Sequence, residues 1–261
     1  MMKETPFAAQ RPCEGLGEPF YYFASLGSTN DTAASLAQDG ACHGTLVFAD
    51  EQTSGRGREK RRWITPPGTA LALSVILRLP GHGVETLPYA GLGAVAVSDA
   101  LAELGVGAVI KWPNDVLVGN RKLSGVLAEV SWTGEQADAI ILGIGVNVLP
   151  GAVPPPESIR IPATCVEWEA GHSVSREDLL QRIVCALGRR LNAGASSWMQ
   201  IWEQRLAFLG QEVSLKSGSG SLRGVVRGLD ERGRLLLAQG DRITPVHVSE
   251  MRMELVDRAE E

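Results

Sequence analysis

The strongest chemical signal in this chain is a short loop rich in glycine and arginine. Residues 54–58 read Ser-Gly-Arg-Gly-Arg, and residues 59–63 continue Glu-Lys-Arg-Arg-Trp. Glycine lets backbone amides approach a ligand closely, and arginine presents planar donors that suit carboxylate or phosphate oxygens. The pattern predicts a loop that orders around an anionic ligand. A solvated basic loop, or a patch that contacts RNA, explains this segment alone equally well.

A second cluster of reactive side chains follows an apolar segment in the middle of the chain. Residues 111–115 read Lys-Trp-Pro-Asn-Asp, and residues 121–125 read Arg-Lys-Leu-Ser-Gly. Asn114 and Asp115 can organise a nucleotide or a magnesium-bound phosphate. Lys122 can neutralise charge that develops at a reacting carboxylate or phosphate. The alternative is a turn stabilised by the Asn and Asp side chains beside an exposed lysine.

Two further motifs carry weaker signals. Residues 143–147 (Gly-Ile-Gly-Val-Asn) follow a strand but lack GxGxxG spacing, which argues against a dinucleotide fingerprint. The glycines can instead thin the sheet for a ligand, although a strand with a bulge fits as well. Residues 28–30 (Ser-Thr-Asn) can bind a small polar ligand or simply cap a helix. The GxxxxGK[ST] phosphate loop does not occur in the sequence, so any ATP site must use another architecture.

Hydrophobic periodicity predicts the elements that position these motifs. Helices are expected at residues 26–40, 88–104, 175–193 and 196–207. Strands are expected at residues 44–50, 70–79, 108–112, 116–118, 123–132 and 138–148, with a hairpin turn at 118–121. The strands after residue 108 follow one another too closely for helical crossovers, which favours an antiparallel or mixed sheet. The proline-rich residues 150–162 are expected to form an extended or mobile loop.

The character of the sequence changes after Gly210. Short alternating segments broken by Gly and Ser fill residues 211–256, which predicts a small all-β unit, a barrel. We therefore place a domain boundary near residue 209, between residues 1–209 and 210–261.

Composition narrows the class of protein. Hydrophobic residues make up 44% and charged residues 21% of the 261 residues, as in ordinary soluble globular proteins. The net charge of −5 argues against general nucleic-acid binding. The four scattered cysteines form no CxxC pair, which argues against zinc and dithiol sites, and we expect them to stay reduced. The sequence has no signal-peptide pattern and no apolar run long enough to cross a bilayer, so we expect a cytoplasmic protein without membrane contacts.

Taken together and in this order, the motifs resemble those of the biotin–protein ligases. The resemblance extends from about residue 22 to residue 250, and the combination of residues 55–58, 111–115 and 121–125 is highly specific. It implies an α+β fold with a mixed sheet and helices on one face, related to class II aminoacyl-tRNA synthetases. Residues 1–209 would bind biotin and ATP, and residues 210–261 would form an SH3-like β-barrel. With some twenty residues before its first motif, the chain resembles the short class without an N-terminal helix-turn-helix.

The resemblance also implies a reaction and a role for each motif residue. Biotin would attack the α-phosphate of Mg-ATP to give biotinyl-5′-AMP, and a carrier-protein lysine would then accept the biotin. The residues that would hold biotin are Ser28, Thr29, Asn30, Gln52, Gly55, Arg56, Gly57, Arg58, Lys122, Gly125 and Gly143. The residues that would organise ATP, and Mg²⁺ through its phosphates, are Trp63, Lys111, Asn114, Asp115 and Asn147. The catalytic residues would be Lys122, Arg58 and Asp115, with Asp115 orienting or deprotonating the incoming lysine.

One position departs from the family pattern, and two alternatives stay open. The family usually continues GRGRxGR, whereas this chain has Lys60 at the second glycine. A stiffer loop could alter its closure. A lipoate–protein ligase would share the fold and the adenylate chemistry but would not be expected to show residues 55–58 or 111–115 in this form. A non-catalytic RNA- or ligand-binding module would use the basic cluster at 56–62. We expect no DNA partner, and an exposed sheet edge would allow a homodimer.

Overall fold

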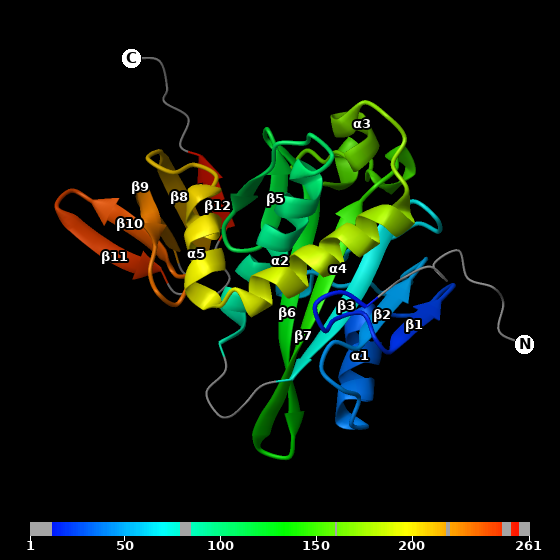
Figure 1. Cartoon of the computed structure of the whole chain (residues 1–261). Helices are drawn as coiled ribbons and strands as arrows, with labels where there is room; N and C mark the ends of the chain where they lie inside the picture. Colours follow the sequence, from blue (N-terminus) through cyan, green and yellow to red (C-terminus); the bar gives the residue numbers. More distant parts are fainter. Residues whose placement is uncertain (1–11, 79–84, 160, 218–219, 247–251, 256–261) are drawn as a thin grey trace, which may run out of the picture.

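The chain is described by a computed structural model that covers residues 12–78, 85–159, 161–217, 220–246 and 252–255. Its larger sheet has seven strands in the order β1-β2-β3-β7-β6-β5-β4 (Figure 1). These strands are β1 (Phe20–Phe23), β2 (Leu46–Ala49), β3 (Ala70–Arg78), β4 (Val109–Lys111), β5 (Asp115–Val118), β6 (Arg121–Thr133) and β7 (Gln136–Asn147). Strand β1 pairs in parallel with β2, and the other neighbours are antiparallel. The prediction of a mixed sheet is therefore confirmed.

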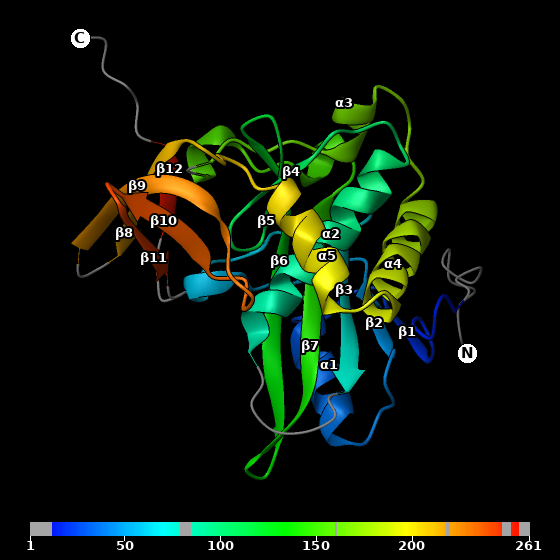
Figure 2. The same cartoon turned by 60° about the vertical axis from the view of Figure 1, so that its left-hand side comes forward.

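The helices cover both faces of this sheet. They are α1 (Thr29–Gln38), α2 (Thr86–Ala102), α3 (Val166–Ala170), α4 (Arg176–Asn192) and α5 (Ala195–Gln204). Helices α2, α4 and α5 lie together on one face, and α1 lies on the other (Figures 1 and 2). The prediction that helices cover one face is thus wrong for α1. Its Ala33 and Ala37 pack against Val47, Ile76 and Ile141, which point away from the main core.

Burial on both faces explains why the central strands lack a polar side. Strand β3 is apolar at nearly every position and its first eight residues are buried, as expected for a strand covered on both faces. Ser74 is the single hydroxyl in this strand and is fully buried. The predicted elements occur within a few residues of their expected bounds, whereas β1 and α3 were not predicted. Residues 150–162 contain two short 3₁₀ helices, η2 (Pro150–Ala152) and η3 (Pro156–Ser158).

Helix α4 begins where its sequence predicts. Ser175 takes the N-cap position, and its Oγ accepts the backbone N–H of Asp178 at 3.1 Å. We expect Ser175→Ala to lower the free energy of unfolding by about 1 kcal/mol, because one N–H of the first turn loses its partner. Urea denaturation of the two proteins measures the difference. An unchanged midpoint would contradict the capping role.

The C-terminal strands form a second, smaller sheet beside the first. Its order is β11-β10-β9-β8-β12, built from β8 (Glu212–Ser217), β9 (Gly220–Leu229), β10 (Leu235–Gln239), β11 (Arg242–Val246) and β12 (Arg252–Leu255). The all-β prediction is confirmed, but a closed barrel is not seen, since no pairing joins β11 to β12 within the described ranges. The Trp112 indole donates to the carbonyl of Gly233 at 2.9 Å and so links the sheet to the β4–β5 turn.

The cysteines do not all remain free thiols. Cys13 and Cys185 form a disulfide, while Cys42 and Cys165 are free. The prediction of four reduced thiols is therefore wrong for this pair, because the segment before β1 folds back against α4 and brings the two Cα atoms to 5.0 Å. Among the described helices, none has the length and apolar character needed to span a bilayer.

Candidate active site

The reactive centre of the site is an ion pair between two neighbouring strands. Lys122 lies near the start of β6 and Asp115 at the start of β5, and their side chains meet with Lys122 Nζ 2.5 Å from Asp115 Oδ1. Both side chains are mostly buried. A lysine has three N–H donors, so Lys122 can hold Asp115 and still donate to two further oxygens.

Two other cations belong to the same electrostatic cluster. Burial lowers the pKa of Arg58, while the carboxylates of Glu59 and Asp115 oppose that change. Burial also lowers the pKa of Lys111, and again Asp115 opposes the change while Lys122 adds to it. Lys122 thus contacts Asp115, and Arg58 and Lys111 lie within electrostatic reach of the same carboxylate. A site with this excess of positive charge suits an anionic ligand.

The arginine-rich loop is held at its base by backbone hydrogen bonds. The N–H of Trp63 donates to the carbonyl of Gly55 at 2.9 Å, and the N–H of Gly57 donates to the carbonyl of Arg61 at 2.7 Å. A short 3₁₀ helix, η1 (Arg58–Lys60), forms the tip. Glu59 there adopts a left-handed conformation with φ 57°, so the strained position is next to Lys60, the residue at which the sequence departs from the expected pattern.

Trp63 covers the middle of the site. Its indole packs against Gly145 so closely that a Cβ there would lie 2.4 Å from the ring. It also contacts Gly125 and lies 5.5 Å, centroid to Nζ, from Lys122. The buried Trp63 Nε1 has no hydrogen-bond partner in the described chain. These two glycines therefore make room for an aromatic ring on the sheet, beside the reactive lysine.

A buried polar network forms the other end of the site. Gln52 Oε1 accepts the backbone N–H of Thr29 at 2.8 Å. Ser74 Oγ lies 2.8 Å from Thr29 Oγ1 and 2.6 Å from Asn30 Oδ1. Gly143 adjoins Asn30, and a Cβ on it would lie 2.2 Å from Asn30 Oδ1. Ser28, the N-cap residue of α1, is buried beside this network but makes no capping bond.

Several predicted residues hold the framework instead of facing the ion pair. Asn114 Nδ2 donates to the carbonyl of Val126 at 2.6 Å, and Asn147 Nδ2 donates to the carbonyl of Thr164 at 3.1 Å. Thr164 in turn donates its N–H to the carbonyl of Lys122. Asn114 and Asn147 therefore brace the backbone around Lys122. The Arg56 guanidinium pairs with the carboxylates of Asp31 on α1 and Glu129 on β6.

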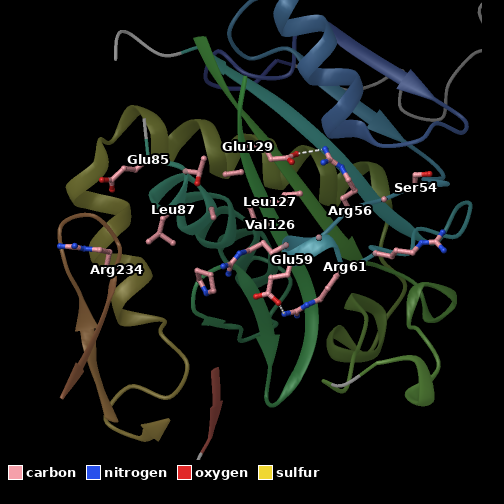
Figure 3. A pocket seen from close by; sticks show the side chains of 18 of the residues that line it. Ser54, Arg56, Glu59, Arg61, Glu85, Leu87, Val126, Leu127, Glu129 and Arg234 are labelled. Atoms are coloured by element: carbon pink, nitrogen blue, oxygen red, sulfur yellow. Dashed lines mark hydrogen bonds and ion pairs between the residues drawn. The ribbon is translucent and has the colours of Figure 1, made fainter. Parts of the chain in front are cut away.

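The loop, the sheet and the small domain enclose a pocket of about 1020 Å³. Figure 3 shows its lining, with Arg56 and Ser54 on one side, Glu59 and Arg61 near the centre, and Glu85 and Arg234 on the far side. The pocket reaches the arginine loop but not Lys122 or Gly143, because Trp63 lies over the intervening floor. Among the residues placed in the structure, no cluster of three His, Cys, Asp or Glu side chains is arranged to hold a metal by itself.

Comparison with known proteins agrees with these features. Residues 22–147 match the "Biotin/lipoate A/B protein ligase family", and residues 208–252 match the "Biotin protein ligase C terminal domain". A biotin–[acetyl-CoA-carboxylase] ligase of Paracoccus denitrificans is 35% identical, covering 82% of this chain and 92% of the relative. The chain belongs to the biotin/lipoate A/B protein ligase family.

Other members of the family align over most of this chain. The bifunctional ligase/repressor BirA of Bacillus subtilis is 32% identical, over 92% of this chain and 75% of its own length. Among solved structures, a biotin protein ligase from Aquifex aeolicus in complex with biotin and ATP superposes with a TM-score of 0.79. The two sequences are 28% identical, and the alignment covers 92% of this chain and 100% of the Aquifex chain.

Two residues of this site escaped the sequence analysis. Ser74 is a lone hydroxyl in an apolar strand, and Glu129 is a lone charge between Ala128 and Val130 on β6. A polar group inside an apolar strand is a usable signal, because burying it without a partner is unfavourable. Their partners Thr29 and Asn30, by contrast, lie far away in the sequence and could not be inferred from spacing.

Proposed function

We propose that this protein is an ATP-dependent ligase that converts biotin to biotinyl-5′-AMP and transfers the biotin to a lysine of a biotin carboxyl carrier protein. The observation that carries the proposal is that a neutral polar network and a cationic group lie a short distance apart on the same strands. Lys122 Nζ adjoins Gly125, and Asn30 adjoins Gly143, which pairs with Leu127. These positions are two residues apart along β6, or about 7 Å.

That spacing suits the shape of biotin. The polar network of Thr29, Gln52, Ser74 and Asn30 presents hydroxyl and amide groups that fit a ureido ring. The Lys122 ammonium, which lies about 7 Å along β6 from this network, fits the carboxylate at the end of the acyl chain of biotin. Trp63 lies between the two ends, on the part of the sheet where the acyl chain of biotin would run. Biotin binding requires the indole to shift, since it now rests directly on Gly145.

The first step joins two anions, so it needs cations at the meeting point. A carboxylate oxygen of biotin attacks the α-phosphorus of ATP, the bond to the β-phosphate oxygen breaks, and pyrophosphate leaves. Lys122 and Arg58 stabilise the charge that develops, and burial strengthens their effect. Mg²⁺ would neutralise charge on the ATP phosphates, and the side-chain oxygens of Asp115 and Asn114 are the kind of ligand that would hold it there.

The second step uses the same centre. The amine of the acceptor lysine attacks the acyl carbon of biotinyl-5′-AMP, an amide forms, and AMP leaves with the electron pair of the broken bond. Asp115 orients the incoming amine and takes up its proton, while Lys122 stays on the departing phosphate. Most of the acceleration comes from positioning and electrostatics, without a covalent enzyme intermediate.

ATP–pyrophosphate exchange with and without biotin tests the proposed activity. We expect exchange only when biotin is present, and no exchange with lipoate as the acid. Exchange driven by lipoate would assign the chain to the other branch of its family. Absence of exchange with either acid, together with salt-sensitive binding of RNA, would favour the basic loop as a nucleic-acid surface.

The loop arginine should control the release of the adenylate. We expect Arg58→Gly to retain adenylation within about tenfold, because Lys122 remains, but to release biotinyl-5′-AMP into solution. The measurement is biotin labelling of a bystander protein that is not a carrier. Arg62→Gly, an exposed change in the same loop, serves as the control and should add no labelling. Equal labelling by both variants would contradict a lid role for Arg58.

A further inference from the structure

Glu129 is a charged residue in the site to which no role has been assigned. It lies on β6, and its carboxylate oxygen Oε2 accepts two hydrogen bonds. Asn30 Nδ2 donates at 2.6 Å, and Arg56 Nη2 donates at 3.1 Å. Figure 3 shows Glu129 and Arg56 reaching toward each other across the edge of the pocket. One carboxylate thus joins helix α1, the arginine-rich loop and the central sheet.

The contact with Asn30 determines which groups of the buried network donate hydrogen bonds and which accept them. A carboxylate only accepts hydrogen bonds, so the amide nitrogen of Asn30 must face Glu129. Its oxygen then faces Ser74, whose single hydroxyl proton goes to Asn30. Thr29 Oγ1, which lies 2.8 Å from Ser74 Oγ, donates its own proton to Gln52 Oε1 at 3.1 Å. Thr29 Oγ1 therefore offers lone pairs to a ligand, which suits the N–H groups of a ureido ring.

The contact with Arg56 holds the start of the loop. Two carboxylates share this guanidinium, but Asp31 is 63% exposed and Glu129 34%. Asp31 lies closer, at 2.5 Å against 3.1 Å, but solvent weakens the more exposed pair, so we expect Glu129 to be the stronger anchor. Arg56 lies between Gly55, which is packed under the Trp63 carbonyl, and Gly57, which bonds to Arg61. Holding Arg56 on β6 therefore keeps the backbone of the loop over the polar network.

Glu129 acts at a distance from the reacting atoms. Glu129 bonds to Asn30 at the ring end of the site, whereas Lys122 Nζ adjoins Gly125 at the other end. It therefore has no direct contact with the carboxylate that is activated. An effect confined to the ring end of the substrate would appear in the KM for biotin and not in kcat.

We propose that Glu129 is a positioning residue for the ring of the acid substrate, acting through Asn30 and Arg56. This inference rests on the proposed function. In the ligand-free protein, the carboxylate orients the donor and acceptor groups of the network and holds the arginine-rich loop in place above them. The site is then preorganised for one arrangement of N–H and C=O groups.

Three substitutions separate the two contacts in ATP–pyrophosphate exchange. Glu129→Leu removes both and should raise the KM for biotin about tenfold, with kcat and the KM for ATP within about twofold. Glu129→Gln keeps an acceptor for Asn30 but loses the charge on Arg56, so the expected rise is about threefold. Asp31→Asn, which removes the exposed partner of the same guanidinium, should change the KM by less than about twofold.

The outcomes are distinguishable from a failure of the proposed function. Biotin-dependent exchange by the unmodified protein tests that function, and the ratio of variant to unmodified KM tests the role of Glu129. Should Glu129→Leu melt at a much lower temperature, Glu129→Asp supplies the folded variant and should recover most of the affinity for biotin. An unchanged KM for biotin in a folded Glu129→Leu, or an equal fall in kcat for all variants, would overturn the inference.

Discussion

Lys122→Ala should slow biotin-dependent ATP–pyrophosphate exchange by about 10²- to 10³-fold, the typical loss when one preorganised donor is removed from a developing charge. The Lys122 side chain is 25% exposed and its Asp115 partner 14%, so solvent cannot replace the ammonium effectively. The substitution also leaves the Asp115 carboxylate unpaired where two anions must meet. We therefore expect the loss mainly in kcat, with the change in KM for biotin smaller.

A second ion pair in the chain provides the matched control. Lys216 lies 2.5 Å from Glu254, the same nitrogen–oxygen distance as in the Lys122–Asp115 pair, but its side chain is 56% exposed. Lys216→Ala should therefore leave the exchange rate within about twofold. A full rate for Lys122→Ala in quenched single-turnover assays would remove this lysine from the mechanism.

Gly143→Ala should raise the KM for biotin by about a hundredfold. The new Cβ would lie 2.2 Å from Asn30 Oδ1, and strand β7 cannot move aside because Gly143 is paired on both sides, with Ser74 and Leu127. Asn30 must then leave its place and give up its bonds to Ser74 and Glu129. Two buried polar groups that lose their partners account for an effect of this size.

Gly107→Ala is the matched control for this change. Gly107 has ordinary backbone angles and open space around its Cβ position, so the same added methyl group should leave the KM for biotin unaltered. Isothermal titration with biotin measures the affinity directly and separates it from catalysis. Equal affinity in Gly143→Ala and the unmodified protein would show that Asn30 has no part in binding the ring.

Much of the fold follows from local sequence pattern. Helix α4 begins at Ser175 as its capping box predicts, and Gly40, with φ 90°, follows the end of α1. Glycine is favoured there because the left-handed conformation is costly for other residues. Strand periodicity likewise located β3, β6 and β7. The apolar strands could not show which face α1 covers, since a strand buried on both faces has no polar side to mark the outside.

Some features of the site also follow from the sequence, and others only from the tertiary structure. Residue types and their order along the chain determined its chemistry: arginines and a lysine for anions, carboxylate and amide groups near them, and glycines where the backbone must be approached. Only the tertiary structure decided the partners. It placed Lys122 on Asp115, Trp63 on Gly145, and Arg56 on Glu129 instead of the reacting centre. The physical reason is that helix and strand preferences depend on neighbours along the chain, whereas ion pairs and buried hydrogen bonds depend on which strands and helices the folded core brings within a few ångströms.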